Sequence, residues 1–496
     1  MSSDVRTYGG WRRAVVGGMG KFTLGQTIGL LTAGFAVVIT NWLAGMWWAA
    51  GLGAVMGLVA ALMAVRDKYG MNFFDRRGEA MRFRRARRRQ TNLYRSGVLS
   101  VSRRSDGHCR LPGVLGRARL SEHSDAYRRP FAVVHHGDGH LTVVMAIAPT
   151  GEHLMDKEAV DQEVARFGLW IASLSDEVGV CGASVTVETR PDTGRRLRRE
   201  VDSRMSPQAP EAARRIVDGV VERSGSAGSQ IHTWATMSFD PAAMGAGARG
   251  RAGRAVADIA TRLPGLTQTF AGWGAGPVHL MTAEEVKRML RVAYDPDAEA
   301  LFDRAADEGM DVDLPFSEVG PAAADAHWDR YRHDSAVSCT WVMRRAPRGT
   351  VQSGSLRRLL RVSRDVERKR VTIIYRPMDP ARAPDVVERD VDKAVNKRRM
   401  ASRPTARMDR DVAQARQTSE EEAGGASITD FGMIITATVS GPDAPERIAD
   451  ARATVEGLSA ASRLVMRPAW GCQDSAFALG LPMGLMPSQQ ALTGGW

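Results

Sequence analysis

The sequence is poor in cysteine, and one long part of it has no charge. Four cysteines among 496 residues, none in a Cys-x-x-Cys pair, exclude a disulfide-built scaffold and give no support to a structural zinc site. Residues 22–65 contain no Asp, Glu, Lys or Arg, although 25% of the chain is charged and its net charge is +12. The 44% content of hydrophobic residues is that of a folded protein, so wholesale disorder is excluded as well.

The uncharged run predicts a membrane hairpin. A helix needs about 20 apolar residues to cross a bilayer, so the 44 positions of this run suffice for two crossings and a tight turn. We expect the spans at residues 22–40 and 46–65, with the turn at 41–45. A cleavable signal peptide, whose apolar region has only ~7–15 residues, is the weaker alternative. Three tryptophans are expected at the far interface, where indole rings are favoured: Trp42, Trp47 and Trp48.

Basic residues on both sides of the run set the expected orientation. Arg12, Arg13 and Lys21 precede it, Arg66 and Lys68 follow it, and the loop between the spans has no charge. Positive charge stays on the cytoplasmic side of a membrane. We therefore expect a plasma-membrane protein with two spans, with its N- and C-termini both in the cytoplasm.

An arginine-rich segment follows the second span. Residues 76–95 hold nine arginines against one acid, Glu79, so the local excess is nine minus one, or +8, which is two thirds of the net charge of +12. Anionic lipid head groups attract such a juxtamembrane segment. A DNA contact is the alternative, and nucleic acid stays open as a partner. The expected lipid contacts are Arg76, Arg77, Arg82, Arg84, Arg85, Arg87, Arg88 and Arg89.

The rest of the chain alternates strand-like and helix-like segments. The fold class that we predict is α+β, with an N-terminal two-helix transmembrane hairpin followed by mixed α/β cytoplasmic modules. Asp138 and Gly139 between two apolar runs predict a β-hairpin, and Thr282 with Glu285 predicts a capping box. The expected divisions are a cytoplasmic tail (1–21), the hairpin (22–65), a basic juxtamembrane segment (66–96), a first α+β module (97–294), an acidic linker or helical segment (295–334) and a second module (335–496) with a charged helical insertion (385–422).

No motif for catalysis or for a cofactor stands out. The Gly-Lys pair before the hairpin lacks the spacing of a phosphate-binding loop, because the first position is Val15 and the last is Phe22. No Gly-x-Ser-x-Gly elbow occurs either. We therefore expect a protein that is not an enzyme and has no cofactor.

Histidines and aromatic residues of the body are interpreted as ordinary structure. His135, His136 and His140 flank the predicted hairpin turn and are expected to be exposed there. Trp328 and Tyr331 are three positions apart, which places them on one face of an expected helix. The three histidines do not have the spacing of a metal site.

Two local patterns carry a resemblance to known families. Residues 7–13, Thr-Tyr-Gly-Gly-Trp-Arg-Arg, precede the hairpin and resemble actinobacterial membrane proteins encoded beside conjugation-type ATPases. The run from 373 to 484 is similar to the end of the N-terminal domain of the large type IV secretion ATPases. In that family a Gln…Phe…Leu-Pro-x-Gly stretch leads into the motor domain, and residues 473–484 show the same pattern.

The resemblance implies a two-span membrane subunit fused to such an ATPase N-terminal domain, without the motor. The implied function is that of a non-catalytic inner-membrane subunit of a conjugation or type IV-like secretion machine. Such a subunit anchors and positions a separate cytoplasmic ATPase and assembles with other membrane subunits and as a homo-oligomer. A type VII secretion membrane component is the alternative, followed by a membrane-tethered DNA-binding protein or a membrane-bound enzyme. The candidate partner contacts are Gln473, Phe477, Leu481, Pro482 and Gly484, together with the charged helices of 385–422.

Overall fold

The protein divides into two compact units, an N-terminal unit that ends at Thr91 and a body that begins at Asn92. The expected tail 1–21, with the pattern at 7–13 and the basic residues before the hairpin, lies outside the described residues. The computed structural model describes residues 24–98, 100, 107–149, 155–192, 194–206, 208–225, 229–245, 251–310, 312–347, 351–363 and 365–487.

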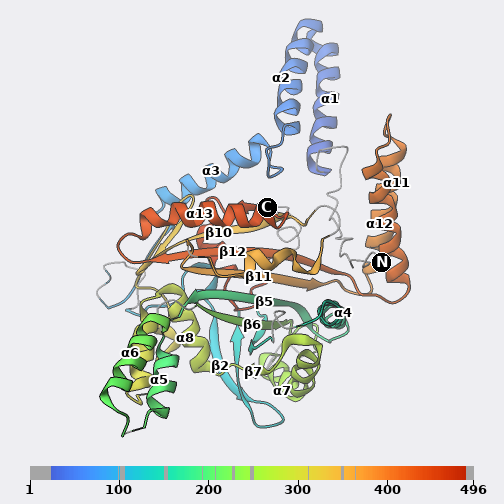
Figure 1. Ribbon diagram of the computed structural model, residues 1–496. Coiled ribbons are helices and arrows are strands. Elements are labelled where there is room, and N and C mark those ends of the chain that lie inside the picture. Colours follow the sequence, from blue (N-terminus) through green and yellow to red (C-terminus); the bar gives the residue numbers. More distant parts are fainter. Residues whose placement is uncertain are drawn as a thin grey trace. The chain divides into compact units, whose positions relative to one another are not determined.

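The N-terminal unit begins with the predicted helical hairpin. Helices α1 (Leu24–Ala44) and α2 (Met46–Ala64) lie side by side and are long and apolar enough to cross a membrane (Figure 1). The turn consists of Gly45 alone, whose φ of 88° suits glycine, so the first helix extends past the expected end at residue 40. Trp42 and Trp47 lie beside this turn with 89% and 84% of their surfaces exposed. A third helix, α3 (Phe73–Arg88), completes the unit.

The body is built on one antiparallel sheet, which confirms the α+β class. Among the described residues the sheet has thirteen strands. They are β1 (Leu93–Arg95), β2 (Arg119–Ser124), β3 (Pro130–His135), β4 (Leu141–Ile147), β5 (Val180–Pro191), β6 (Ser229–Phe239), β7 (Val278–Leu280), β8 (Ala323–Ala326), β9 (Tyr331–His333), β10 (Ala336–Arg345), β11 (Arg368–Pro377), β12 (Thr429–Ser440) and β13 (Val465–Pro468).

The sheet consists of two halves with the same topology. One half has the order β5-β6-β4-β3-β2 with β7 paired to β4, and the other has the order β11-β12-β10-β9-β8 with β13 paired to β10. We call them repeat 1 and repeat 2. They meet where β5 and β11 pair antiparallel, with Thr186 opposite Thr372. We call this junction the seam. Figure 1 shows the seam strands between β6 and β12. Two equal units joined in this way have the symmetry of a homodimer within one chain.

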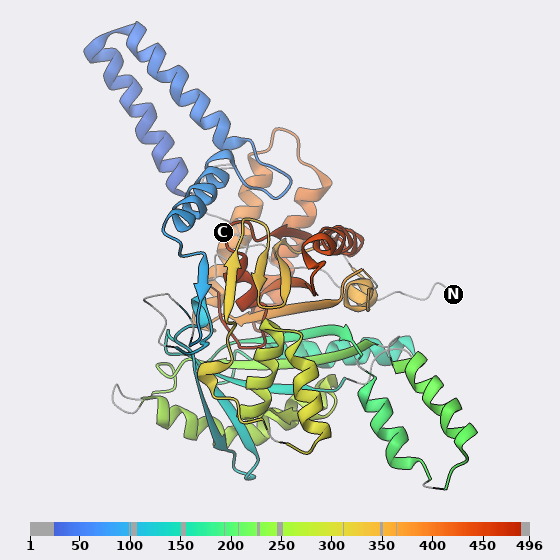
Figure 2. The ribbon, with the colours of Figure 1, turned by 90° about the vertical axis from the view of Figure 1, so that its left-hand side faces the viewer.

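The helices occupy matching places in the two repeats. A two-helix arm follows each seam strand, α5–α6 in repeat 1 and α11–α12 in repeat 2, and the two arms project from opposite sides of the body (Figures 1 and 2). Repeat 1 contains α4 (Lys157–Ser173), α5 (Arg195–Arg204), α6 (Glu211–Gly225), α7 (Arg251–Phe270) and α8 (Ala283–Tyr294). Repeat 2 contains α10 (Arg357–Leu360), α11 (Ala383–Arg399), α12 (Ala406–Ala423), α13 (Ala444–Ala461) and α14 (Gln473–Leu479), and α9 (Ala298–Asp307) lies between the repeats.

Helices cover both faces of the sheet, which explains why the strands are apolar on both sides. On β3, Phe131 and Val133 belong to a core that also contains residues of α4 and α7. The alternate residues Ala132 and Val134 belong to a second core with α8 and α14. This second core extends across both repeats, whereas α13 covers the opposite face of repeat 2 alone.

Several sequence predictions are confirmed locally, and others are wrong at longer range. The β3–β4 hairpin turns at Gly139, and Thr282 forms the predicted capping box with Glu285. The predicted modules, however, are halves of one sheet. Residues 295–334 contain the helix α9, in agreement with the helical alternative, but they are more than a linker, because they also supply β8 and β9 to the sheet. The helix expected around Trp328 and Tyr331 is absent, since Tyr331 begins β9 and Trp328 lies in the preceding loop.

Candidate functional site

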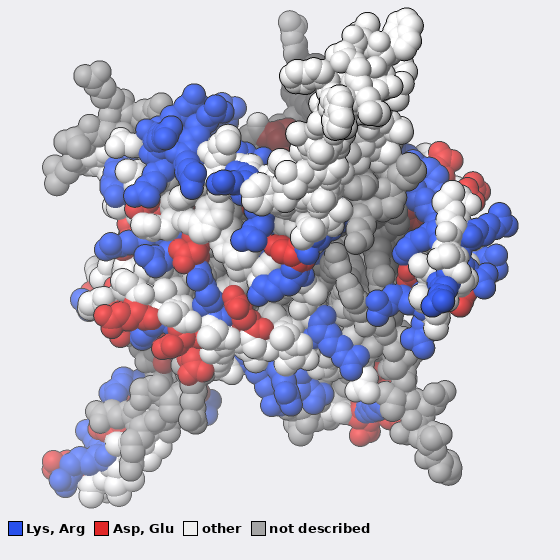
Figure 3. All heavy atoms as spheres, turned by 90° about the horizontal axis from the view of Figure 1, so that it is seen from above, with Lys and Arg blue, Asp and Glu red and all other residues white. Residues whose placement is uncertain are grey.

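The predicted lipid-contact arginines lie on and just after α3. All eight are exposed, and only Asp75 and Glu79 oppose them on the helix. Asn72 caps the helix through Asp75 N at 2.8 Å, and the Asp75 side chain returns the bond in a capping box. Figure 3 shows an uncharged hairpin surface and a gathering of Lys and Arg atoms over α3.

The arginines of α3 surround the helix rather than forming one stripe. At 100° per residue, Arg76, Arg82 and Arg84 point in different directions. Between them Phe73, Phe74 and Met81 are exposed at 47%, 40% and 68%. Long arginine side chains can reach head groups from any side of a helix while aromatic rings enter the interface. The arrangement therefore suits a helix that lies at an anionic membrane surface.

An ordered loop joins the hairpin to α3. Asp67 accepts hydrogen bonds from the backbone N–H of Tyr69 at 2.9 Å and of Met71 at 3.0 Å, and its own N–H donates to Met71 O. Gly70 takes the positive φ of 80° that this tight turn requires. Because the loop is held by its own bonds, the direction in which α3 leaves α2 is set within the N-terminal unit.

The five predicted partner contacts are buried in the body, which corrects their role. Gln473 is fully buried and acts as a short extension of the sheet, since its Oε1 accepts from Thr340 N at 2.8 Å and its Nε2 donates to Thr340 O at 3.3 Å. Pro482 is buried too. These side chains satisfy groups of their own chain, so they offer no surface to a partner.

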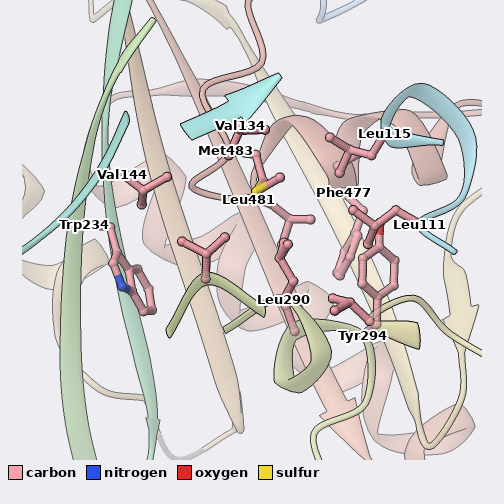
Figure 4. Packing of buried hydrophobic residues seen from close by; sticks show 14 of the residues in the cluster. Leu111, Leu115, Val134, Val144, Trp234, Leu290, Tyr294, Phe477, Leu481 and Met483 are labelled. Atoms are coloured by element: carbon pink, nitrogen blue, oxygen red, sulfur yellow. The ribbon is translucent and has the colours of Figure 1, made fainter. Parts of the chain in front are cut away.

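The same C-terminal segment fills the core that both repeats share. Phe477 packs against the rings of Tyr294 and Tyr331, and Leu481 lies among the labelled side chains around Leu290 (Figure 4). Gly484 has a φ of 67°, and an added Cβ would come within 2.3 Å of a methyl carbon of Thr142. The Gln…Phe…Leu-Pro-x-Gly pattern is therefore a packing signature, in which glycine allows the chain to approach β4.

Two buried histidines occupy the same place in the two repeats. His136 Nε2 lies 3.1 Å from Thr142 Oγ1, and His333 Nε2 lies 2.8 Å from Ser338 Oγ. In both repeats that hydroxyl then contacts a hydroxyl of the next strand, Ser238 or Thr438. The expectation that His136 is exposed at a turn is wrong, because only 8% of its surface is exposed. Matching element orders in the two halves of the sequence are the signal that would have revealed the pair.

Each of these histidines also reaches a carbonyl of the other repeat. His136 Nε2 is 3.0 Å from Met483 O, and His333 Nδ1 is 2.5 Å from Tyr294 O. A carbonyl only accepts, so these ring nitrogens donate. Burial lowers the pKa of His136 and lowers the pKa of His333 to about 4. Both rings are therefore neutral at pH 7 and act as cross-links between the repeats.

A buried ionic cluster also holds the seam. Glu188 Oε2 on β5 accepts from Arg370 Nε at 2.7 Å and lies 2.6 Å from Arg370 Nη2, so two guanidinium nitrogens contact one carboxylate oxygen. Arg368 on β11 and Arg190 on β5 share the carboxylate of Glu299. Burial opposes the charge of Glu188, but the guanidinium groups of Arg370, Arg368 and Arg190 outweigh it and lower its pKa. Because these arginine and glutamate side chains bind one another across β5 and β11, the cluster has a structural role.

The charged segment 385–422 forms the predicted helices and stands out as the arm α11–α12. Ion pairs join its two helices, with Arg398 Nε 2.5 Å from Asp409 and Lys397 Nζ 3.6 Å from Asp411. Few of its side chains are buried, so most of the arm is accessible. Of the sequence-predicted partner surfaces, this arm is the one that the fold leaves exposed.

The described residues contain no group of three or more His, Cys, Asp or Glu side chains that would hold a metal ion. No model of a protein family matches the chain, and no curated protein matches it significantly.

Proposed function

We propose that this chain is a non-catalytic membrane subunit of a conjugation or type IV-like secretion machine, which anchors and orients a separate cytoplasmic ATPase. The observation that carries the proposal is the N-terminal unit. It combines two helices of membrane-spanning length with a third helix on which all eight predicted arginines are exposed. In this proposal the hairpin spans the plasma membrane and both termini are cytoplasmic, because the basic residues lie outside the hairpin and not in its turn.

The body supports a scaffolding role. Its large apolar side chains pack into continuous cores, and the sequence has no phosphate-binding loop. A separate motor would supply hydrolysis, and the exposed charges of α11–α12 suit a contact that guides its docking.

Replacing the eight arginines by glutamine is expected to detach α3 from an anionic surface. Each charge near such a surface contributes about 1 kcal/mol. In nanodiscs with anionic lipid, amide hydrogen exchange of residues 73–88 in the wild type should therefore be at least tenfold slower than in zwitterionic nanodiscs. The glutamine variant should lose this difference, whereas an eightfold Arg→Lys variant should keep most of it.

Equal exchange of the wild type in both kinds of nanodisc would argue against the lipid contact. If added duplex DNA slows exchange in the same helix, with a steep salt dependence that the glutamine variant lacks, the DNA-binding alternative is favoured instead.

In this proposal a separate motor ATPase binds the full-length protein in mild detergent. Three exposed arginines are changed to Glu, Arg407 and Arg410 on α12 and Arg403 just before it, and this should slow association about tenfold, since rim charges act mainly on the association rate. Interferometry with the immobilised chain measures this rate. A matched control changes Arg198, Arg204 and Arg215 on the equivalent arm of repeat 1. Docking through α11–α12 is wrong if both triple variants behave alike, and ATP turnover by the isolated chain would refute the non-catalytic role.

A further inference from the structure

The two repeats differ at their outer edges. In repeat 2 the edge strand β8 is covered by β1, which precedes both repeats in the sequence. In repeat 1 the edge strand β2 pairs with β3 on one side, and no strand of the described residues pairs with its other side. The sheet therefore ends in a covered edge and an open edge at positions that are otherwise equivalent.

The covered edge shows how an additional strand pairs with the sheet at this position. Strand β1 runs antiparallel to β8, with Leu93 opposite Asp325 and Arg95 opposite Ala323. The side-chain amide of Asn92 donates to Asp325 Oδ1 at 3.1 Å, and Tyr94 packs against the shared core. A short extended segment thus completes repeat 2 through backbone pairing and one polar contact to the edge strand.

The open edge has an opposite charge at the equivalent position. Because His136 and His333 are equivalent, so are the preceding residues, His135 and Arg332. Their strand partners are Arg119 on β2 and Asp325 on β8. A guanidinium donor therefore replaces the carboxylate acceptor that binds Asn92.

Positive charge dominates the exposed approach to β2. Arg117 and Arg119 are both exposed: Arg117 lies in the turn that leads into β2, and Arg119 is the first residue of the strand. The acidic residue of the strand, Glu122, lies on the other side, where its Oε2 accepts from Ala283 N at 2.8 Å. No ion pair of Arg117 or Arg119 occurs within the described residues.

An open strand edge presents unpaired backbone N–H and C=O groups, and proteins blunt such edges with proline, β-bulges or charged side chains. Strand β2, with the sequence Arg-Leu-Ser-Glu-His-Ser, has no proline and pairs regularly with β3 over all six positions, but it carries the exposed Arg119, so a further strand must complement this charge. Its backbone is therefore a template for one further strand.

We propose that the outer edge of β2 docks an extended acidic segment of a partner protein, which pairs antiparallel with β2 as β1 pairs with β8. The carboxylates of that segment contact Arg117 and Arg119. This docking edge belongs to the body and is independent of the anchoring role of the N-terminal unit.

The test measures binding of fluorescent peptides to the full-length chain in detergent by anisotropy. The probe is an eight-residue peptide that alternates valine and glutamate. In a second version the backbone amides of the odd-numbered residues are N-methylated, and in a third version those of the even-numbered residues. The wild-type chain should bind the probe and one methylated version, while the other version loses at least tenfold in affinity. This selectivity arises only if one edge of the peptide pairs with a strand.

Charge reversal identifies the site. Changing Arg117 and Arg119 to Glu should weaken the probe at least tenfold and should favour a valine–lysine peptide instead. Arg332→Glu, an exposed change on β9, is the matched control and should have no effect. The proposal is overturned if neither peptide binds, or if both methylated versions bind equally. A Ser124→Cys variant tests whether a second copy of the chain binds at this edge. If two copies crosslink through this cysteine and the probe peptide does not prevent the crosslink, the edge binds a second copy and the proposal is overturned.

Discussion

Glu188→Gln is expected to cost about 3–5 kcal/mol of the free energy of unfolding, which is the usual penalty for leaving a buried charge unpaired. Glutamine keeps the shape of Glu188 but removes the charge that Arg370 contacts through two of its guanidinium nitrogens. The cluster then holds three arginines, Arg190, Arg368 and Arg370, against Glu299 alone. Because the cluster joins β5 to β11, the lost stability is that of the contact between the two repeats.

A double variant separates the charge effect from simple loss of packing. Replacing both Glu188 and Arg370 by Met keeps the net charge of the cluster and removes the pair as a unit. Such replacements of a buried pair are often neutral, so the double variant should recover most of the stability that Glu188→Gln loses. Denaturant unfolding of the full-length chain in detergent, followed by tryptophan fluorescence, provides the midpoints. A loss below 1 kcal/mol for the single variant would mean that the cluster is hydrated and contributes little.

The sequence predicted the parts of this fold that depend on neighbouring residues. The absence of charge from 22 to 65 predicted α1 and α2, and Asp138-Gly139 predicted the turn between β3 and β4. The signal in each case lies within one element or one turn, where periodicity and backbone preferences act directly.

The seam and the shared core could not be predicted in this way. Thr186 and Thr372 pair across 186 positions of sequence, and no local pattern encodes which distant strand completes an edge. From the resemblance and the apolar residues 481–486, the C-terminal pattern is expected either to insert into a partner or to pack on its own body, and the structure shows the second. Its real position depends on a space between α8 and β4 that only the folded repeats create.

The duplicated topology also explains why the sequence predicts only a linker or helical segment at 295–334, without the two strands. This segment contains the connection between the repeats, but it then supplies β8 and β9, which are equivalent to β2 and β3. Three- and four-residue strands are too short to show an alternating pattern, so their place in the sheet is evident only from the repeat.

His333→Ala is expected to be the most destabilising single change at the shared core, with a loss of about 3–5 kcal/mol. The ring is fully buried, packs 4.8 Å from the Phe477 ring and bonds both Tyr294 O and Ser338 Oγ. Truncation leaves a cavity and removes the donor to Tyr294 O, while Ser338 Oγ keeps only its contact with Thr438 Oγ1. His136→Ala, the equivalent change in repeat 1, should cost less because that ring has fewer aromatic neighbours among the described residues and is not fully buried. Denaturation midpoints of the two variants measure the difference, and equal losses would contradict it.

The titration of His333 provides an independent test of its burial. Burial lowers its pKa to about 4 in the folded state, against about 6.5 in the unfolded state. Between these values the unfolded chain binds the proton and the folded chain does not, so stability falls as the pH decreases from 6.5 towards 4 and is unaffected above 6.5. His333→Asn keeps an N–H donor for Tyr294 O but cannot titrate. The stability advantage of the wild type over this variant should therefore shrink by about 3 kcal/mol between pH 7 and pH 4. An advantage that stays constant over this range would show that His333 is protonated freely and that the cross-link between the repeats opens to water.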